Sequence, residues 1–112
     1  MNNFFFKKNV IVTGGNSGSG LAISKTFLNM GSNVIRVDKK FDNKIGSSDF
    51  IFNLEKYEKV EILINKIKKK YNKVDVLINN AGITLPSENA WKNYNVYHKT
   101  LSVNLHAPFY LI

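Results

Sequence analysis

The sequence has no cysteine, a single tryptophan and few acidic residues, with eight aspartates and glutamates against sixteen lysines and arginines. Without cysteine, the chain can form neither disulfides nor thiolate metal sites. Its apolar runs are far shorter than the roughly 20 residues that span a bilayer, and Phe4–Phe6 is too short for the core of a signal peptide. With 112 residues and 44% hydrophobic content, the chain is predicted to be one soluble, cytoplasmic domain at most, without a membrane partner.

The net charge of +8 raises the question of a nucleic-acid partner. No zinc-ligand spacing, aromatic-interleaved basic strand or helix-turn-helix pattern accompanies the charge. The lysines at 66–70 end a predicted helix, where cations complement the helix dipole. His98 and His106 lie eight residues apart without a carboxylate ligand pattern. We therefore predict neither nucleic-acid binding nor a metal site.

A glycine-rich segment is the most informative feature that is present. Residues 13–20, Thr-Gly-Gly-Asn-Ser-Gly-Ser-Gly, follow a short apolar run and precede an amphipathic stretch. This order predicts a strand, a tight turn and a helix whose first N–H groups attract phosphate. Gly14 is expected to adopt backbone angles closed to other residues, and Gly18 and Gly20 to permit close approach of phosphate or the strand. The segment favours a dinucleotide-binding half-domain over a turn without a ligand.

Asp38 closes a second apolar run and lies 18 residues beyond Gly20. An acidic residue about 20 positions on, at the end of the next strand, can accept hydrogen bonds from ribose hydroxyls. An ordinary surface aspartate beside Lys39 and Lys40 is the alternative. A carboxylate here repels a 2′-phosphate, which favours NAD over NADP, although the Lys39 ammonium softens that repulsion.

Residues 75–82, Asp-Val-Leu-Ile-Asn-Asn-Ala-Gly, resemble a buried parallel strand that ends in polar amides. Amides at this end of a strand fall where ligands bind in open α/β sheets. The hydrophobic periodicity predicts parallel strands in the order 3-2-1-4, with two helices before strand four, a polar loop over 84–95 and a last helix beyond it. The predicted strands cover about 9–13, 33–38, 49–53 and 74–79, and the predicted helices about 18–30 and 60–71. In the first helix, the residues expected to face inward are Leu21, Ile23, Phe27, Leu28 and Met30.

Together these segments resemble the short-chain dehydrogenase/reductase family. Its cofactor pattern Thr-Gly-x-x-x-Gly-x-Gly is met at 13–20, and its Asn-Asn-Ala-Gly pattern is met at 79–82. Asn104, in Val-Asn-Leu, is similar to the helix asparagine that helps to hold a water relay in the family's active site. The resemblance implies an α/β fold with a Rossmann-like, doubly wound parallel sheet. It also implies cofactor contacts by Thr13, Gly14, Asn16, Ser17, Gly18, Gly20, Asp38, Asn53, Leu54, Asn80, Ala81 and Gly82.

Two departures from the family pattern bear on the cofactor. Asn53 stands where many members have an aspartate that contacts the adenine amino group, and its side-chain oxygen can still accept that hydrogen bond. Ser17 stands where NADP-dependent members often have an arginine, which again favours NAD. The family chemistry also needs a serine and a Tyr-x-x-x-Lys pair, and no tyrosine of this chain has a lysine four positions later.

By this resemblance, residues 1–112 are the N-terminal part of one NAD(P)-binding domain, with the catalytic part absent. The function implied is hydride transfer between NAD(P) and an alcohol or ketone. A non-catalytic dinucleotide-binding module and an interaction subunit remain as alternatives. In the order 3-2-1-4 the outer edge of strand four is bare, and exposed sheet edges invite pairing. We therefore expect the isolated chain to be marginally stable, or to pair with a second copy or a complementing chain.

Overall fold

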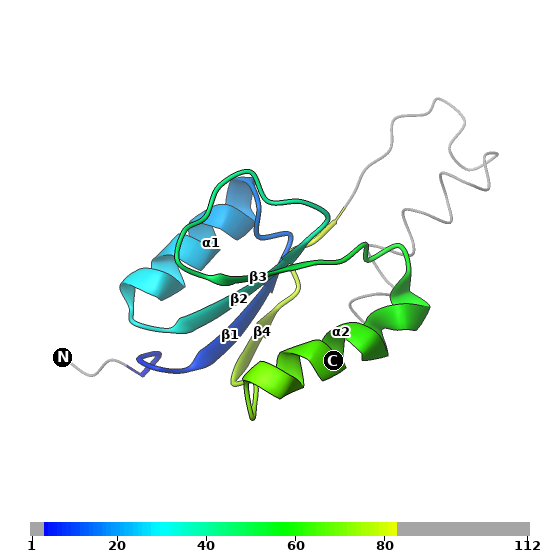
Figure 1. Ribbon diagram of the computed structural model, residues 1–112. Coiled ribbons are helices and arrows are strands. Elements are labelled where there is room, and N and C mark those ends of the chain that lie inside the picture. The colour runs from blue at the N-terminus through cyan, green and yellow to red at the C-terminus, as the bar shows by residue number, and fades with distance from the viewer. Residues whose placement is uncertain (1–3, 83–112) are drawn as a thin grey trace.

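The computed structural model describes residues 4–82, which form a parallel sheet between two helices (Figure 1). Its four strands lie in the order β3-β2-β1-β4, as predicted, and every pairing is parallel. The elements are β1 (Asn9–Thr13), α1 (Gly18–Asn29), β2 (Asn33–Asp38), β3 (Ser48–Ile51), the short 3-10 helix η1 (Tyr57–Lys59), α2 (Val60–Lys70) and β4 (Val76–Ile78). The predicted α/β, Rossmann-like architecture is therefore confirmed for this part of the chain.

Within residues 4–82, α1 packs against one face of the sheet and α2 against the other, because successive strand residues point to opposite faces. Val10, Val12 and Val34 form a buried cluster on the α1 side. On the other side, strand residues Ile11, Ile35 and Val37 pack with Leu54 and the α2 residues Leu63 and Ile67. Both faces of β1 and β2 are thus covered, which explains why these strands read as continuous apolar runs.

Helix α1 approaches the sheet through its small residues. Gly20 and Ser24 are its buried residues, and the Ser24 hydroxyl donates to the Gly20 carbonyl at 2.7 Å. Ile23, Phe27 and Leu28 are half-buried and pack beside this contact. The expectation that Ile23, Phe27 and Leu28 face inward is therefore confirmed, although these side chains are half-buried rather than fully buried. Gly20 and Ser24, one turn apart, are the buried positions of α1, and the larger side chains of Ile23, Phe27 and Leu28 pack on either side of them.

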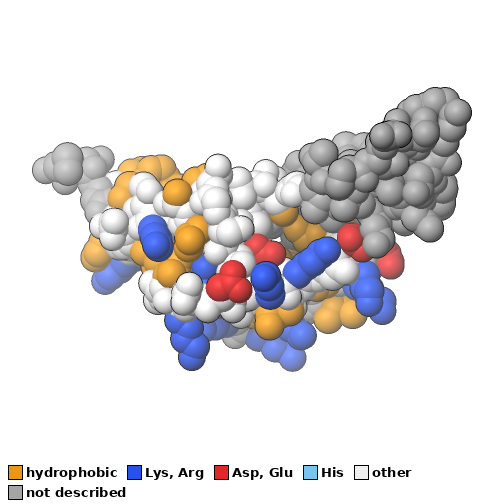
Figure 2. All heavy atoms as spheres, turned by 90° about the horizontal axis from the view of Figure 1, so that it is seen from above, with side chains coloured by type: hydrophobic (Ala, Val, Ile, Leu, Met, Phe, Trp, Pro, Cys, Tyr) orange, Lys and Arg blue, Asp and Glu red, His pale blue; other side chains and the backbone are white. Residues whose placement is uncertain are grey.

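Helix α2 follows its predicted periodicity, with Val60, Leu63 and Ile67 buried one turn apart. Its last turn carries Lys68–Lys70, and these cations complement the negative end of the helix dipole. On the face seen in Figure 2, lysine side chains are spread over the surface with acidic side chains among them. Within residues 4–82, no helix is long and apolar enough to cross a membrane.

Strand β4 is shorter and more exposed than predicted. It spans only Val76–Ile78, all of them half-buried, and Val74 is 44% exposed. At its start, the Asp75 carboxylate accepts the Asn9 backbone N–H at 2.8 Å, so a side chain replaces part of the ladder. This hydrogen bond holds the pKa of Asp75 below its usual value. Strand β3 is also shorter than predicted, ending at Ile51 rather than at residue 53.

Candidate functional site

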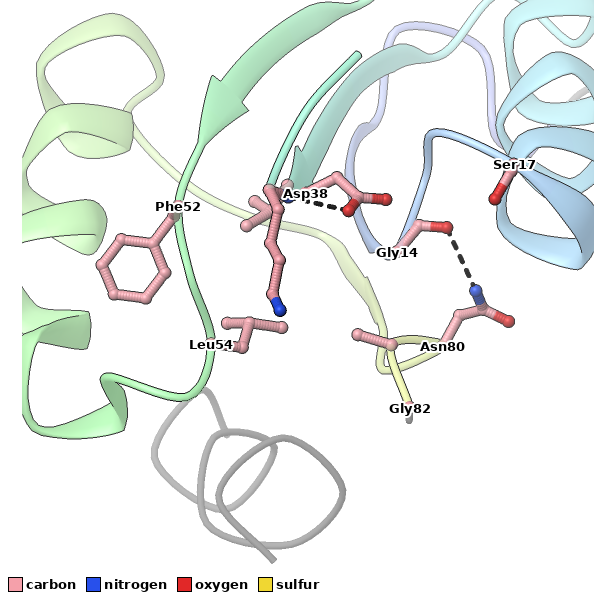
Figure 3. Close-up of a pocket in the computed structure, with 10 residues that line it drawn as sticks. Gly14, Ser17, Asp38, Phe52, Leu54, Asn80 and Gly82 are labelled. Atoms are coloured by element: carbon pink, nitrogen blue, oxygen red, sulfur yellow. Dashed lines mark hydrogen bonds between the residues drawn. The ribbon is translucent and has the colours of Figure 1, made fainter. Parts of the chain in front are cut away.

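A cleft of about 340 Å³ opens beyond the carboxyl ends of β1, β2 and β4 (Figure 3). In an open α/β sheet this edge is where ligands bind. The cleft is lined by Gly14, Ser17, Val37, Asp38, Lys39, Phe52, Leu54, Asn80, Ala81 and Gly82. Segments far apart in the sequence therefore meet around one space, with the glycine-rich turn on one wall and residues that follow β3 on another.

The glycine-rich turn needs its glycines for two different reasons. Gly14 has φ +68° and Gly18 has φ +56°, a backbone region that side chains disfavour. A Cβ on Gly20 would overlap the Gly14 carbonyl oxygen, whereas a Cβ on Gly18 would meet nothing within 4 Å. Gly20 therefore brings the helix against the turn, and Gly18 leaves open space at the helix start.

Helix α1 begins without a side-chain cap. Ser17 is its N-cap residue, with extended backbone angles, and its side chain makes no capping hydrogen bond. No acidic side chain lies in the first turn. Among residues 4–82, the first N–H groups of α1 thus have neither the capping hydroxyl nor the first-turn carboxylate that usually satisfies them. An uncapped helix start beside a cleft can bind an anion.

Asp38 lies at the cleft, with its carboxylate pointing toward the Gly14–Ser17 wall (Figure 3). One carboxylate oxygen accepts the Asn16 backbone N–H at 3.0 Å, and the other accepts the Lys39 backbone N–H at 2.7 Å. These bonds orient the carboxylate and tie it directly to the glycine-rich turn. Each oxygen keeps a lone pair that can accept a further hydrogen bond.

Thr13 and Asn80 join the ends of β1 and β4. The buried Thr13 hydroxyl oxygen accepts the backbone N–H groups of Asn80 and Ala81, at 3.1 and 3.0 Å. The Asn80 side-chain amide donates to the Gly14 carbonyl at 3.3 Å (Figure 3). The turn after β1 and the segment after β4 are therefore held together by hydrogen bonds within the protein, without a ligand.

We predict that Thr13→Val lowers the free energy of unfolding by about 1–3 kcal/mol, because two N–H groups lose their acceptor while the side-chain shape is kept. Thermal melting of the full chain measures this loss. Thr26→Val is the matched control, since the exposed Thr26 hydroxyl only donates to the Ala22 carbonyl on the surface of α1. Equal melting temperatures for the two variants would contradict the role given to Thr13.

The other residues predicted to contact a cofactor lie around the cleft or behind it. Gly14, Ser17, Asp38, Leu54, Asn80, Ala81 and Gly82 line it. Thr13, Asn16, Gly18 and Gly20 shape the turn from outside the lining. Asn53 is half-buried, and its side-chain oxygen accepts the Glu55 backbone N–H at 3.0 Å. Asn104 lies outside the described residues, as does the polar loop at 84–95.

Sequence reasoning did not assign Val37 or Phe52 to the site, and it considered Lys39 only for its charge near a 2′-phosphate, although all three line the cleft. Val37 and Lys39 are the sequence neighbours of Asp38, which was predicted to bind the ribose, and this position could have indicated that they line the cleft. Lys39 also reaches Glu55, with 3.4 Å between its Nζ and the carboxylate.

Among residues 4–82, no group of three or more histidine, cysteine or acidic side chains is placed to hold a metal ion.

A family model for short chain dehydrogenases matches residues 8–112. The match covers nearly the whole chain, so the chain belongs to the short-chain dehydrogenase family. The fold and the cleft described above agree with this family.

Two similar solved structures are an aldohexose dehydrogenase of Thermoplasma acidophilum in ligand-free form and a 4-hydroxyisoleucine dehydrogenase complexed with NADH. The first is 29% identical with a TM-score of 0.85, over 95% of this chain and 42% of that one. The second is 31% identical with a TM-score of 0.85, over 93% of this chain and 46% of that one. The chain thus spans less than half the length of these relatives.

Proposed function

We propose that this chain binds NAD in the cleft at the ends of β1, β2 and β4, as the cofactor-binding portion of an oxidoreductase. One observation carries the proposal: the glycine-rich turn and Asp38 lie at the same cleft and are joined by the hydrogen bond from the Asn16 N–H. Family membership and the relative that is complexed with NADH support it. In this proposal, residues 1–112 form the N-terminal part of a single NAD(P)-binding domain.

The pyrophosphate is assigned to the start of α1. Ser17 leaves the helix uncapped, and Gly18 leaves space where a side chain would intrude. The helix N–H groups and the dipole favour the two negative charges there. The Ser17 hydroxyl, which lines the cleft, adds a further donor.

The adenosine is assigned to the side of the cleft formed by Asp38 and Leu54. The Asp38 carboxylate accepts from the ribose hydroxyls, and Asn53 and Leu54 lie on the adenine side. A 2′-phosphate would meet the Asp38 carboxylate, and Ser17 offers no positive charge in its place. These features favour NAD over NADP.

Asn80, Ala81 and Gly82 are assigned to the other half of the cofactor, where small side chains let it pack against the backbone. When bound, the nicotinamide supplies the hydride acceptor or donor for an alcohol or ketone. We propose Asn104 as a residue of the catalytic site. Reading the coding sequence beyond codon 112 for a serine and a Tyr-x-x-x-Lys pair tests the oxidoreductase activity of the whole protein.

Calorimetric titration of the full chain with NAD and with NADP tests the cofactor assignment. We expect saturable binding of NAD and binding of NADP that is weaker by about tenfold or more, since a buried or half-buried charge repels a second one. No heat with either dinucleotide, in a chain whose folding is verified by circular dichroism, would contradict the proposal. Equal affinities would contradict the role given to Asp38.

A further inference from the structure

Arg36 is the only arginine of the sequence, and its side chain is completely buried in the middle of β2. It lies on the α1 side of the sheet, because it is two residues after Val34. Its guanidinium makes a two-point contact with the Asp49 carboxylate of β3, at 2.8 Å from Nε and 2.7 Å from Nη2. A buried guanidinium is retained only where its partners are well placed, since burial of an unpaired charge is costly.

Arg36 also holds the connection between β2 and β3, which has no helix. A parallel connection needs about a dozen residues or more and is usually helical, but β2 and β3 are joined by residues 39–47, which contain no helix. Within this crossover loop, the Asn43 carbonyl and the Ser47 hydroxyl both accept from Arg36, at 2.9 Å each. The guanidinium carbon lies 4.6 Å from the centre of the Phe41 ring. The loop is therefore folded around one side chain in place of a helix.

The same guanidinium reaches the glycine-rich turn. Arg36 Nη1 donates to the Gly15 carbonyl at 3.0 Å, and a Cβ on Gly15 would come within 2.9 Å of the Arg36 side chain. On the solvent side, Asn16 and Asp42 exchange two hydrogen bonds, of 3.0 and 2.8 Å. The crossover loop and the turn are thus tied together from inside by Arg36 and from outside by Asn16.

The charge state of the network supports this arrangement. Burial acts to raise the pKa of the Asp49 carboxyl, but the hydrogen bonds from Arg36 and Ser47 outweigh burial and lower the pKa below its usual value. Asp49 is therefore ionised at neutral pH and neutralises Arg36. Neither residue lines the cleft, so any effect of this pair on a ligand must pass through the two loops that it holds.

We propose that Arg36 is the positioning residue of the cofactor site: by binding Gly15 and the crossover loop together, it sets the phosphate-binding turn at a fixed distance from Asp38. Asp38 lies between the two loops in sequence and in space, bonded to the Asn16 N–H on one side and the Lys39 N–H on the other. The inference rests on the proposed binding of NAD. In this inference, the buried Arg36 keeps the turn and Asp38 at the spacing that lets one dinucleotide bind through its pyrophosphate and its ribose together.

Arg36→Lys in the full chain tests the inference, with Val34→Ala as the matched control on the same face of the same strand. Lysine keeps the charge but cannot reach Gly15, the crossover loop and Asp49 together. We expect the Kd for NAD to rise about tenfold in Arg36→Lys, and the Kd for NADP, which gains little from Asp38, to rise less. Val34→Ala is expected to lower the melting temperature while leaving both Kd values and their ratio unchanged.

Asp49→Asn weakens the contact between Arg36 and β3 while keeping the shape of the side chain. It is expected to change the ratio of the Kd for NAD to the Kd for NADP in the same direction as Arg36→Lys. An unchanged ratio in both folded variants, or the same change in Val34→Ala, would overturn the inference. Hydrogen exchange of the ligand-free chain separates this failure from that of the proposed function. In Arg36→Lys, amide hydrogen exchange is expected to be faster than in the wild-type chain at residues 14–17 and 39–47, and unchanged in α2. An equal increase in all of these segments, or no increase, would overturn the inference even in a chain that binds NAD.

Discussion

Replacing Gly20 with alanine is expected to lower the free energy of unfolding by about 3 kcal/mol or more, the upper end of the overpacking range. The added Cβ would overlap the Gly14 carbonyl oxygen and lie 2.6 Å from the Asn80 side-chain nitrogen. A backbone oxygen cannot rotate away as a side chain can, so α1 must move from the turn. For a domain of this size, the melting temperature should fall by roughly 10–20 °C, and NAD binding should be lost with the helix start.

Gly46→Ala is the matched control for this substitution. Gly46 has φ +95°, and a Cβ there would meet nothing within 4 Å. Alanine at this position therefore has only backbone strain, about 1–2 kcal/mol. If Gly20→Ala melts no lower than Gly46→Ala, the contact between α1 and the turn is not as close as described.

Replacing Asp38 with asparagine is expected to weaken NAD binding by about 10- to 100-fold, the effect of losing hydrogen bonds to a charged acceptor. NADP binding should weaken less or improve, because the repulsion of a 2′-phosphate is removed. Asparagine keeps the shape of the side chain but offers one acceptor where the carboxylate offers two, so either the Asn16 or the Lys39 N–H loses its partner. The buried core is not altered, so the fold should be preserved, which circular dichroism can verify before the two Kd values are measured.

Asp75→Asn provides the control, since Asp75 accepts the Asn9 N–H at the opposite end of the strands. We expect this variant to bind both dinucleotides like the wild-type chain. An Asp38→Asn variant that retains the wild-type NAD to NADP ratio would show that the ribose is bound elsewhere.

The sequence predicted the strands, their order and the meeting of residues 13–20 with Asp38, because each follows from local rules. Apolar runs of this length mark buried strands, and right-handed connections fix the order of parallel strands. The boundaries of β4 could not be predicted in the same way. Val74 continues the apolar run, but Asp75 pairs with Asn9 through both its backbone N–H and its carboxylate, and Asn9 is far away in the sequence.

Arg36 shows the same limit more clearly. Within an apolar run it appears as an ordinary interruption, and nothing nearby indicates that Asp49 and Gly15 are its partners. Its role depends on a crossover loop that lacks a helix, and single-sequence patterns do not show how such a loop packs. Thr13 belongs to the recognised cofactor pattern, yet its hydroxyl accepts the N–H groups of Asn80 and Ala81. The pattern predicted a cofactor contact for Thr13 and did not indicate these hydrogen bonds.

The most direct test of the account is a titration of the isotope-labelled full chain with NAD, followed by amide chemical shifts in nuclear magnetic resonance spectra. If the turn and Asp38 hold one dinucleotide, the largest shifts occur together at Gly14, Ser17, Asp38 and Ala81. A second hollow of similar volume, between β3 and α2 and lined by Phe50 and Lys66 among others, serves as an internal reference. Shifts confined to that hollow, or none at the turn and Asp38 at saturating NAD, would contradict the account.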